Sequence, residues 1–199
     1  MEATPRPLLI VFYRNPVRGA VKTRLAATVG DEKALQIFSK LALHTQDIVA
    51  EVAVDKNVCY SESIQEGDVW PDHYQKTVQH GADLGERMKD AFARGFRSGY
   101  NAICIIGTDC LELTGNIVVE AFESLRHADA VIGPAQDGGY YLLGMRKLYP
   151  EVFRNKAWST ETVCRDTIAD FERLGLTFVK LPVLRDVDTE EDLPDTWKD

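Results

Sequence analysis

The chain has few of the features that mark several classes of protein. Its four cysteines are scattered, with no C-x-x-C pair, and its four histidines show no metal-ligand spacing. No apolar stretch approaches the roughly 20 residues of a membrane span. No run of Lys or Arg occurs, and the formal net charge is −8. These absences argue against a disulfide-stapled protein, a membrane-spanning protein and a nucleic-acid-binding protein.

The same features predict where the protein works and how it is organised. Scattered free cysteines are typical of a reducing compartment, and the start, MEATPRP, lacks the apolar segment of a secretory signal. We therefore expect a cytoplasmic protein. With 199 residues, 45% of them hydrophobic, the chain suits a single globular domain over residues 1–199.

Strand-like and helix-like segments alternate along the chain. β-rich or apolar runs predict strands at 7–13, 56–61, 76–79, 101–107, 128–135, 140–145 and 177–184. Apolar residues spaced three or four apart predict helices at 31–52, 84–96, 117–125 and 163–174, and residues 62–75 read as loop with a short helical turn. The pattern predicts an α/β fold, a three-layer α/β/α sandwich with a mainly parallel sheet. Ligands in such folds bind beyond the carboxyl ends of the strands.

A short basic loop, RNPVRGAVKTRL, follows the first predicted strand and contains Arg14, Gly19, Lys22 and Arg24. A glycine-bearing turn between strand and helix presents backbone N–H groups to an anion, and Lys22 and Arg24 add full charges. The loop is neither a Walker A motif nor G-x-G-x-x-G, since Gly19 stands alone. A solvated basic turn is the alternative, but the position after a buried strand favours phosphate binding.

Carboxylates follow two other predicted strands. Asp109 ends IIGTD, and Asp186 and Asp188 lie in RDVDTEEDL. Mg²⁺ is commonly held by one or two carboxylates plus substrate phosphates, so Asp109 is a candidate metal ligand. Helix capping is the alternative for Asp109, and the segment from Asp188 to Glu191 also fits a capping box.

Two glycine-bearing segments complete the set of candidates. In PAQDGGYYLLG, the Gly138–Gly139 pair allows close approach of a ligand, and Asp137 could hydrogen-bond its hydroxyls; a tight turn is the alternative. In QHGADLGERM, Asp83 could cap a helix while Leu84–Gly85 offers a backbone edge for a base. A simple helix start explains that second segment equally well.

Taken in order, these segments resemble a known superfamily. The stretches NPVRGAVKTRLA, QHGADLGERM, GTDC, GPAQDGGYYLLG, WSTETV and DVDTEEDL, between residues 15 and 193, are similar to the GT-A-fold nucleotide-diphospho-sugar transferases. The chain looks most like a bacterial branch of glycosyltransferases and radical-SAM/selenodomain-associated transferases, related to guanylyltransferases of the 2-phospholactate type. Leu111 departs from this branch, which usually has proline after GTDC.

The resemblance implies a role for each segment. A catalytic set would consist of Asp109, Asp188 and Lys22, with Mg²⁺ or Mn²⁺ bound by Asp109 and Asp188. The nucleotide would contact Arg14, Gly19, Lys22, Arg24, Gly81, Leu84 and Gly85. The acceptor or sugar would contact Asp137, Gly138, Gly139, Trp158, Ser159, Thr160 and Glu161.

Three functions are compatible with such a site. Nucleotidyl transfer from an NTP to a small phosphorylated or sugar-like acceptor would release pyrophosphate. Glycosyl transfer from a nucleotide-diphospho-sugar is the first alternative, and a non-catalytic nucleotide-binding domain is the second. Sugar-transferring members often carry D-x-D, whereas Gly107-Thr108-Asp109 has one carboxylate. A lone Asp109 with a distant Asp188 therefore favours nucleotidyl transfer, and two retained carboxylates argue against a pure binding domain.

Overall fold

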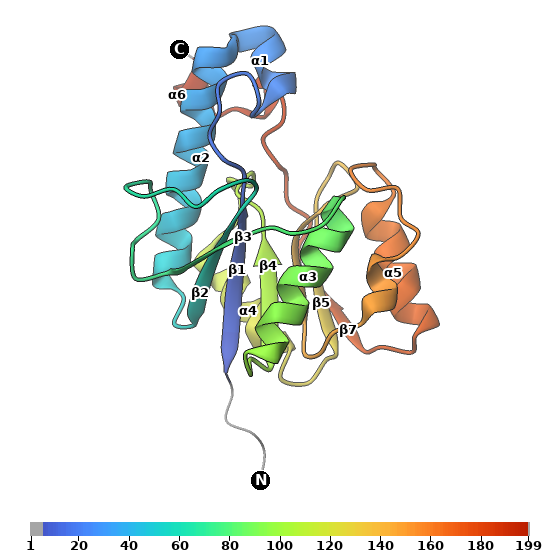
Figure 1. The fold of residues 1–199 in the computed structure, drawn as a ribbon. Coiled ribbons are helices and arrows are strands. Elements are labelled where there is room, and N and C mark those ends of the chain that lie inside the picture. The colour runs from blue at the N-terminus through green and yellow to red at the C-terminus, as the bar shows by residue number, and fades with distance from the viewer. Residues whose placement is uncertain (1–5, 199) are drawn as a thin grey trace.

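Within residues 6–198, which the computed structural model describes, seven strands form a single sheet (Figure 1). The strands are β1 (Pro7–Tyr13), β2 (Asp55–Tyr60), β3 (Gln75–Val78), β4 (Ala102–Ile106), β5 (Ala130–Pro134), β6 (Tyr140–Met145) and β7 (Phe178–Lys180). Their order is β3-β2-β1-β4-β6-β5-β7. Every pairing is parallel except those of β6 with β4 and β5. The predicted α/β fold with a mainly parallel sheet is confirmed.

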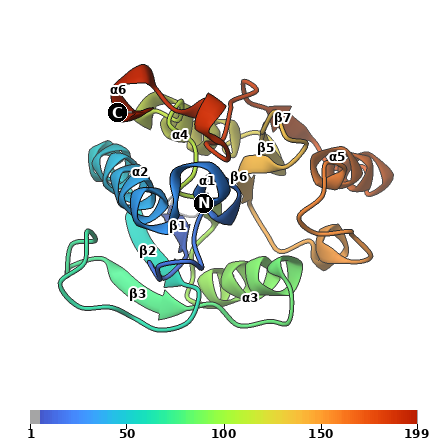
Figure 2. The same ribbon diagram turned by 90° about the horizontal axis from the view of Figure 1, so that it is seen from above.

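Helices cover both faces of this sheet (Figure 2). They are α1 (Thr23–Val29), α2 (Asp31–Glu51), α3 (Leu84–Arg97), α4 (Gly115–Ser124), α5 (Val163–Arg173) and α6 (Asp195–Lys198), with 3₁₀ turns η1 (Pro150–Phe153) and η2 (Glu190–Asp192). Helices α2 and α4 pack on one face, and α3 and α5 pack on the other. No helix of the described residues is both long and apolar enough to cross a membrane.

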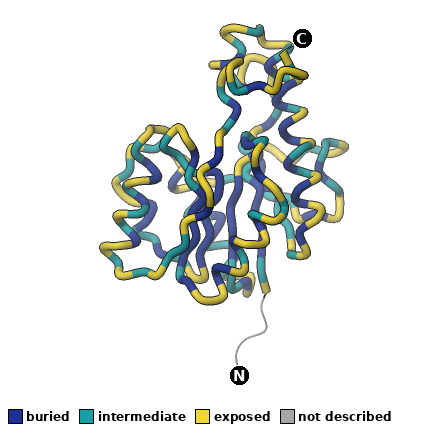
Figure 3. Tube along the Cα trace, turned by 180° about the vertical axis from the view of Figure 1, so that it is seen from behind, coloured by how far each residue is buried: buried dark blue, intermediate teal, exposed yellow. Residues whose placement is uncertain are grey.

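Strand β1 shows why the apolar runs form the centre of the sheet. Leu9 and Val11 pack toward α2 and α4, whereas Leu8 and Ile10 pack toward α3 and α5. All four are buried, as Figure 3 shows for the central strands generally. A strand buried on both faces needs a continuous apolar sequence, and this is what residues 7–13 have.

A small lobe stands above the carboxyl ends of the strands (Figures 1 and 3). It joins α1, the first half of α2 and the C-terminal tail around a separate core cluster that includes Leu25, Leu41 and Val187. This lobe brings the basic loop and the tail together. Helix α1 was not predicted from the sequence. Asp31, an acidic residue just before the apolar stripe of α2, is a candidate cap by its position, but Gly30 is the N-cap and Asp31 is the first helical residue.

Other predicted elements need smaller corrections. The last strand is shorter than the predicted 177–184: it is Phe178–Lys180, followed by an isolated bridge from Leu184 to Ala135. It lies at the edge of the sheet, which is consistent with Pro182 in the predicted range, since proline has no N–H to donate to a central ladder. Residues 62–74 form bends and a single hydrogen-bonded turn, in which the Tyr74 N–H donates to the Pro71 carbonyl at 3.0 Å, and β3 begins at Gln75. Gly175 follows Leu174, the C-cap of α5, with φ 65°, the left-handed conformation in which a glycine commonly ends a helix. The prediction about the first residues of the chain falls mainly on residues 1–5, outside the described residues.

Candidate active site

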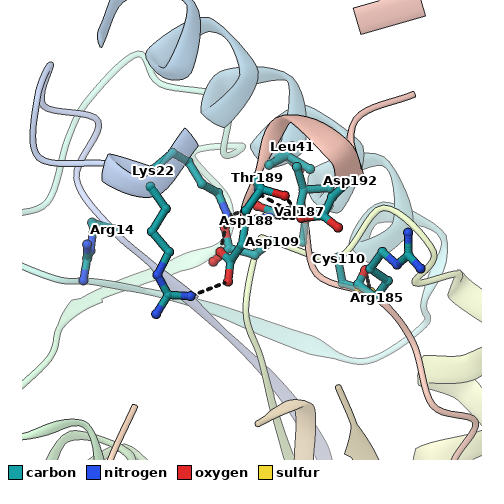
Figure 4. A network of polar contacts seen from close by, with 12 residues as sticks. Arg14, Lys22, Leu41, Asp109, Cys110, Arg185, Val187, Asp188, Thr189 and Asp192 are labelled. Carbon is teal, nitrogen blue, oxygen red and sulfur yellow. Dashed lines mark hydrogen bonds and ion pairs between the residues drawn. The ribbon is translucent and has the colours of Figure 1, made fainter. Parts of the chain in front are cut away.

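Lys22 is the centre of a polar network at the junction of the lobe and the sheet (Figure 4). Its Nζ lies 2.8 Å from Asp109 Oδ1 and 3.7 Å from Asp188 Oδ1, and it donates to the Val187 carbonyl at 2.7 Å. The Lys22 side chain is only 5% exposed. Its backbone adopts the left-handed conformation, φ 49° and ψ 45°, which costs an L-residue about 1–2 kcal/mol.

The two carboxylates face this ammonium and are not helix caps. Helix α4 begins at Gly115 and is capped by Thr114, so the capping alternative for Asp109 is wrong. The predicted capping box was one residue out of register, since Thr189 and Asp192 form it. Asp188 therefore keeps its carboxylate for Lys22 and for Arg24, whose Nη1 lies 3.3 Å from Asp188 Oδ2.

Backbone contacts hold the C-terminal tail against the loop after β4. The Val187 N–H donates to the Asp109 carbonyl at 2.8 Å, and the Arg185 N–H donates to Glu112 Oε2 at 2.8 Å. The thiol of Cys110 donates to the Arg185 carbonyl at 3.5 Å. These contacts explain why Asp109 and Asp188 meet although they are far apart in sequence.

Asp186 lies beside this pair and was given no role in the sequence interpretation. Burial first, and then the nearby carboxylates of Asp109 and Asp137, raise the pKa of Asp186 to about 7, while the Lys22 ammonium opposes this shift. The site thus gathers more carboxylates than Lys22 alone neutralises. The Asp-x-Asp spacing with Asp188 was the sequence signal that could have identified Asp186.

A cavity of about 680 Å³ opens next to the network, within the 300–1,000 Å³ typical of small-molecule sites. Its predicted lining residues are Arg14, Lys22, Arg24, Leu84, Asp109, Trp158, Ser159 and Asp188. Its unpredicted lining residues include Phe12, Ser61, Gln79 and Arg87. The other predicted residues lie outside this lining: Gly19, Gly81, Gly85, Asp137, Gly138, Gly139, Thr160 and Glu161. A smaller cavity of about 310 Å³, between α3 and β2–β3, contains none of the predicted residues.

Four cationic side chains line the larger cavity although the chain is acidic. Lys22 and Arg24 are paired with carboxylates, as described above. Arg14 donates only to the Ala20 carbonyl, at 3.4 Å, and Arg87 donates through Nε to the Gly81 carbonyl, at 3.2 Å. Guanidinium groups with remaining N–H donors at a cavity suit the recognition of phosphate or carboxylate.

Gly85 is explained by packing and not by an open backbone edge. It is the second residue of α3, whose N-cap is Asp83 as predicted, and it is buried. A Cβ on Gly85 would lie 2.2 Å from Cε2 and Cζ2 of Trp158. The segment predicted to contact the base and the segment predicted to contact the acceptor therefore touch each other. The Trp158 ring forms part of the cavity wall on top of Gly85.

Gly138 is a second glycine at which an added side chain would collide, here with the backbone of the segment that contains Glu161. A Cβ on Gly138 would lie 1.9 Å from the Glu161 carbonyl oxygen, and the Gly138 carbonyl accepts from the Cys164 N–H at 2.9 Å. Asp137 accepts from the Gly139 N–H at 2.8 Å, which is the tight turn considered as the alternative. The structure thus brings the predicted acceptor residues together, and their contact with an acceptor stays a prediction.

Comparison with solved structures gives the class of fold. A protein from Desulfovibrio desulfuricans G20, provisionally named a nucleotide-diphospho-sugar transferase, matches 94% of this chain and 84% of its own, with 33% identity and a TM-score of 0.88. The inositol-1-phosphate CTP transferase of T. maritima matches 98% of this chain and 94% of its own, with 12% identity and a TM-score of 0.61. The 4-diphosphocytidyl-2C-methyl-D-erythritol synthase of Anaerococcus prevotii DSM 20548 matches 94% and 92%, with 11% identity and a TM-score of 0.58. The fold is that of the nucleotide-diphospho-sugar transferase superfamily.

The family can be stated more narrowly. The chain belongs to the bacterial family DUF2064, described as an uncharacterized protein conserved in bacteria, whose profile matches residues 41–160. That span includes Asp109, Asp137 and Trp158 but neither Lys22 nor Asp188. A search of curated proteins found no match.

Proposed function

We propose that the protein is a nucleotidyltransferase, which transfers a nucleotidyl group from an NTP to a small phosphorylated or sugar-like acceptor and releases pyrophosphate. One observation carries this proposal. Asp109 and Asp188, from segments far apart in sequence, converge on the Lys22 ammonium at the wall of a cavity of nucleotide size. Arg24 adds a guanidinium at the same point.

The donor set fits a divalent metal. Oxygens of Asp109 and Asp188 already share one cationic partner, and carboxylate oxygens suit Mg²⁺ or Mn²⁺. Among residues 6–198, no group of three or more His, Cys, Asp or Glu side chains is arranged to hold a metal. We therefore expect Asp109 and Asp188 to hold the ion with help from the donor phosphates. When bound, the metal would neutralise charge on the reacting phosphate.

The chain's own residues would bind and orient the reactants. An acceptor oxygen forms a bond to the α-phosphorus while the bond from that phosphorus to the bridging oxygen breaks, and pyrophosphate leaves with the electron pair. Lys22 and Arg24 would stabilise the negative charge on the phosphates. Positioning and charge stabilisation account for most catalysis in phosphoryl chemistry, so no protein nucleophile is required.

Glycosyl transfer is the second candidate, and a specific observation favours it. The relative with 33% identity is provisionally named a nucleotide-diphospho-sugar transferase. In that reaction an acceptor oxygen forms a bond to the sugar's anomeric carbon while the bond from that carbon to the diphosphate oxygen breaks, and the nucleoside diphosphate leaves with the electron pair. Lys22 and Arg24 could hold a departing diphosphate as well as a departing pyrophosphate, so the site geometry is compatible with both reactions.

Product analysis separates these reactions. Each of several NTPs would be incubated with Mg²⁺ and a pool of phosphorylated and hydroxylated metabolites, and pyrophosphate would be measured with the wild type and Asp188→Asn. Glu191→Gln is the matched control, because Glu191 lies in the same segment and is exposed. We expect pyrophosphate release that Asp188→Asn abolishes and Glu191→Gln leaves unchanged.

A parallel set of reactions with nucleotide sugars measures nucleoside diphosphate. Nucleoside diphosphate from a nucleotide sugar, with no pyrophosphate from any NTP, would contradict nucleotidyl transfer and support glycosyl transfer. Tight nucleotide binding with neither product would support the non-catalytic alternative.

A further inference from the structure

The Lys22 ammonium stands where the carboxylates of Asp109 and Asp188 converge. It contacts three oxygens, one from each carboxylate and one from the Val187 carbonyl. The side chain is 5% exposed, whereas those of Asp109 and Asp188 are 48% and 35% exposed. The cation is therefore the most buried member of the group and its anions face the cavity (Figure 4).

An ammonium and a divalent cation compete for such oxygens. Mg²⁺ binds oxygen at about 2.0–2.1 Å and requires near-ideal octahedral geometry. The Lys22 ammonium, 2.8 Å from Asp109 Oδ1, stands in the space between the two carboxylates where such an ion would bind. Two cations at this separation in a partly buried site also repel each other strongly. The ammonium therefore weakens binding of a divalent ion to both carboxylates for as long as it stays between them.

The phosphates of a bound donor would offer the Lys22 ammonium an alternative set of anionic partners. Lys22 lines the cavity, at the first turn of the seven-residue helix α1, and its four-carbon stem lets the ammonium move without moving the sheet. Arg24, on the same helix, is 72% exposed and can accompany it. A polyphosphate in the cavity would draw both cations away from the carboxylates.

We propose that the Lys22 ammonium occupies the metal site between Asp109 and Asp188 and keeps divalent ions out until donor phosphates bind the ammonium instead. This inference rests on the proposed nucleotide site and adds an order to it: metal and phosphate enter together, and metal alone binds weakly. Lys22 would then weaken binding of the free metal ion and strengthen binding of the complex between the metal ion and phosphates.

Mn²⁺ binding tests this without any turnover. Free Mn²⁺ would be measured by electron paramagnetic resonance during titration of the full chain, as wild type, Lys22→Met and Arg18→Ala. The control removes one positive charge from the same loop, at a side chain that is 66% exposed and bound to Glu32. We expect Lys22→Met to bind Mn²⁺ at least tenfold more tightly than the wild type, with Arg18→Ala unchanged. Adding Asp109→Asn to Lys22→Met should remove the gain.

The second titration uses the Mn²⁺ complex of inorganic tripolyphosphate, and here Lys22→Met should change the affinity in the opposite direction. Lys22→Met should bind this complex at least tenfold more weakly than the wild type does. Circular dichroism would establish that each variant is folded, and Lys22→Gln would replace Lys22→Met if the latter is not. Equal Mn²⁺ affinity in wild type and Lys22→Met, or changes of the same sign in both titrations, would overturn the inference. If the product assay gives no pyrophosphate but Lys22→Met changes the two affinities in opposite directions, the proposed nucleotidyl transfer is wrong and this inference about Lys22 stands.

Discussion

The packing of Trp158 on Gly85 can be tested with a single added methyl group. Gly85→Ala puts a Cβ 2.2 Å from two ring carbons of Trp158 and 2.4 Å from its Nε1, distances that real contacts do not allow. Gly85 lies in helix α3 and has no positive φ, so the backbone itself accepts alanine. The indole ring must therefore move out of the cavity wall.

Two opposing terms set the size of the effect. Overpacking of this kind costs about 1–3 kcal/mol. Alanine gains up to about 1 kcal/mol over glycine inside a helix, and less near its start. We expect Gly85→Ala to lower the free energy of unfolding by about 1–2 kcal/mol on balance. In a Trp158→Ala background the clash is gone, so the same change should be neutral or stabilising.

Urea denaturation of the two single variants and the double variant measures this coupling. Gly115→Ala is the matched control, because Gly115 also lies in the first turn of a helix. Its added Cβ would lie 3.1 Å from Oε2 at the flexible end of Glu51, and its other contacts, Glu51 Cβ at 3.7 Å and the Ile48 carbonyl at 3.8 Å, are ordinary van der Waals distances. If Gly85→Ala is as stable as the wild type, or is equally harmful with and without Trp158, the proposed packing of this wall is wrong.

Three further predictions concern charges. Arg24→Ala should weaken triphosphate binding about tenfold or more and have little effect on nucleoside binding, because a guanidinium pairs bidentately with phosphate. Arg24→Lys should restore triphosphate binding only in part. Calorimetric titration with both ligands checks this, and equal losses of affinity for triphosphate and nucleoside would contradict it. Asp109→Ala should keep the fold but lose the extra thermal stabilisation that Mg²⁺ adds to a nucleotide, and a full metal-dependent shift in this variant would contradict metal binding by Asp109. Hydrogen bonds from Thr177 hold the pKa of Asp129 below its usual value. The Asp129 carboxylate therefore stabilises the fold fully above the ordinary pKa of an aspartate, and this stabilisation is lost as the pH falls through the lowered pKa of the folded state. Asp129→Asn should therefore be less stable than wild type at pH 6, with the gap closing below about pH 4 in acid-unfolding experiments; a constant gap would refute the assignment.

Elements with a strong local pattern could be predicted from the sequence. Strands β1 and β4 are continuous apolar runs because both faces are covered, and α3 has a clear apolar stripe and an Asp83 cap. Helix α1 could not be predicted in this way. It has seven residues and one buried side chain, Leu25, which is too little for a period.

The candidate site was predictable in position but not in detail. Lys22 and Asp109 follow the carboxyl ends of the neighbouring strands β1 and β4, so their proximity follows from topology, whereas the strand before Asp188, β7, lies at the far edge of the sheet. The place of Lys22 between the carboxylates depends on how the tail packs against the loop after β4, which no local pattern records. The packing of Trp158 on Gly85 is likewise a long-range contact and was not foreseen.

The central claim is that this cavity binds nucleotide phosphates between the basic loop and the two carboxylates. A crystal structure with Mn²⁺ and a non-hydrolysable α,β-methylene triphosphate tests it directly, using the nucleotide that gives the largest thermal shift in a panel. We predict an anomalous Mn²⁺ peak between Asp109 and Asp188, with the Lys22 ammonium and the Arg24 guanidinium moved onto the phosphates. Phosphates bound elsewhere, or Lys22 still bridging Asp109 and Asp188 beside a bound analogue, would contradict it.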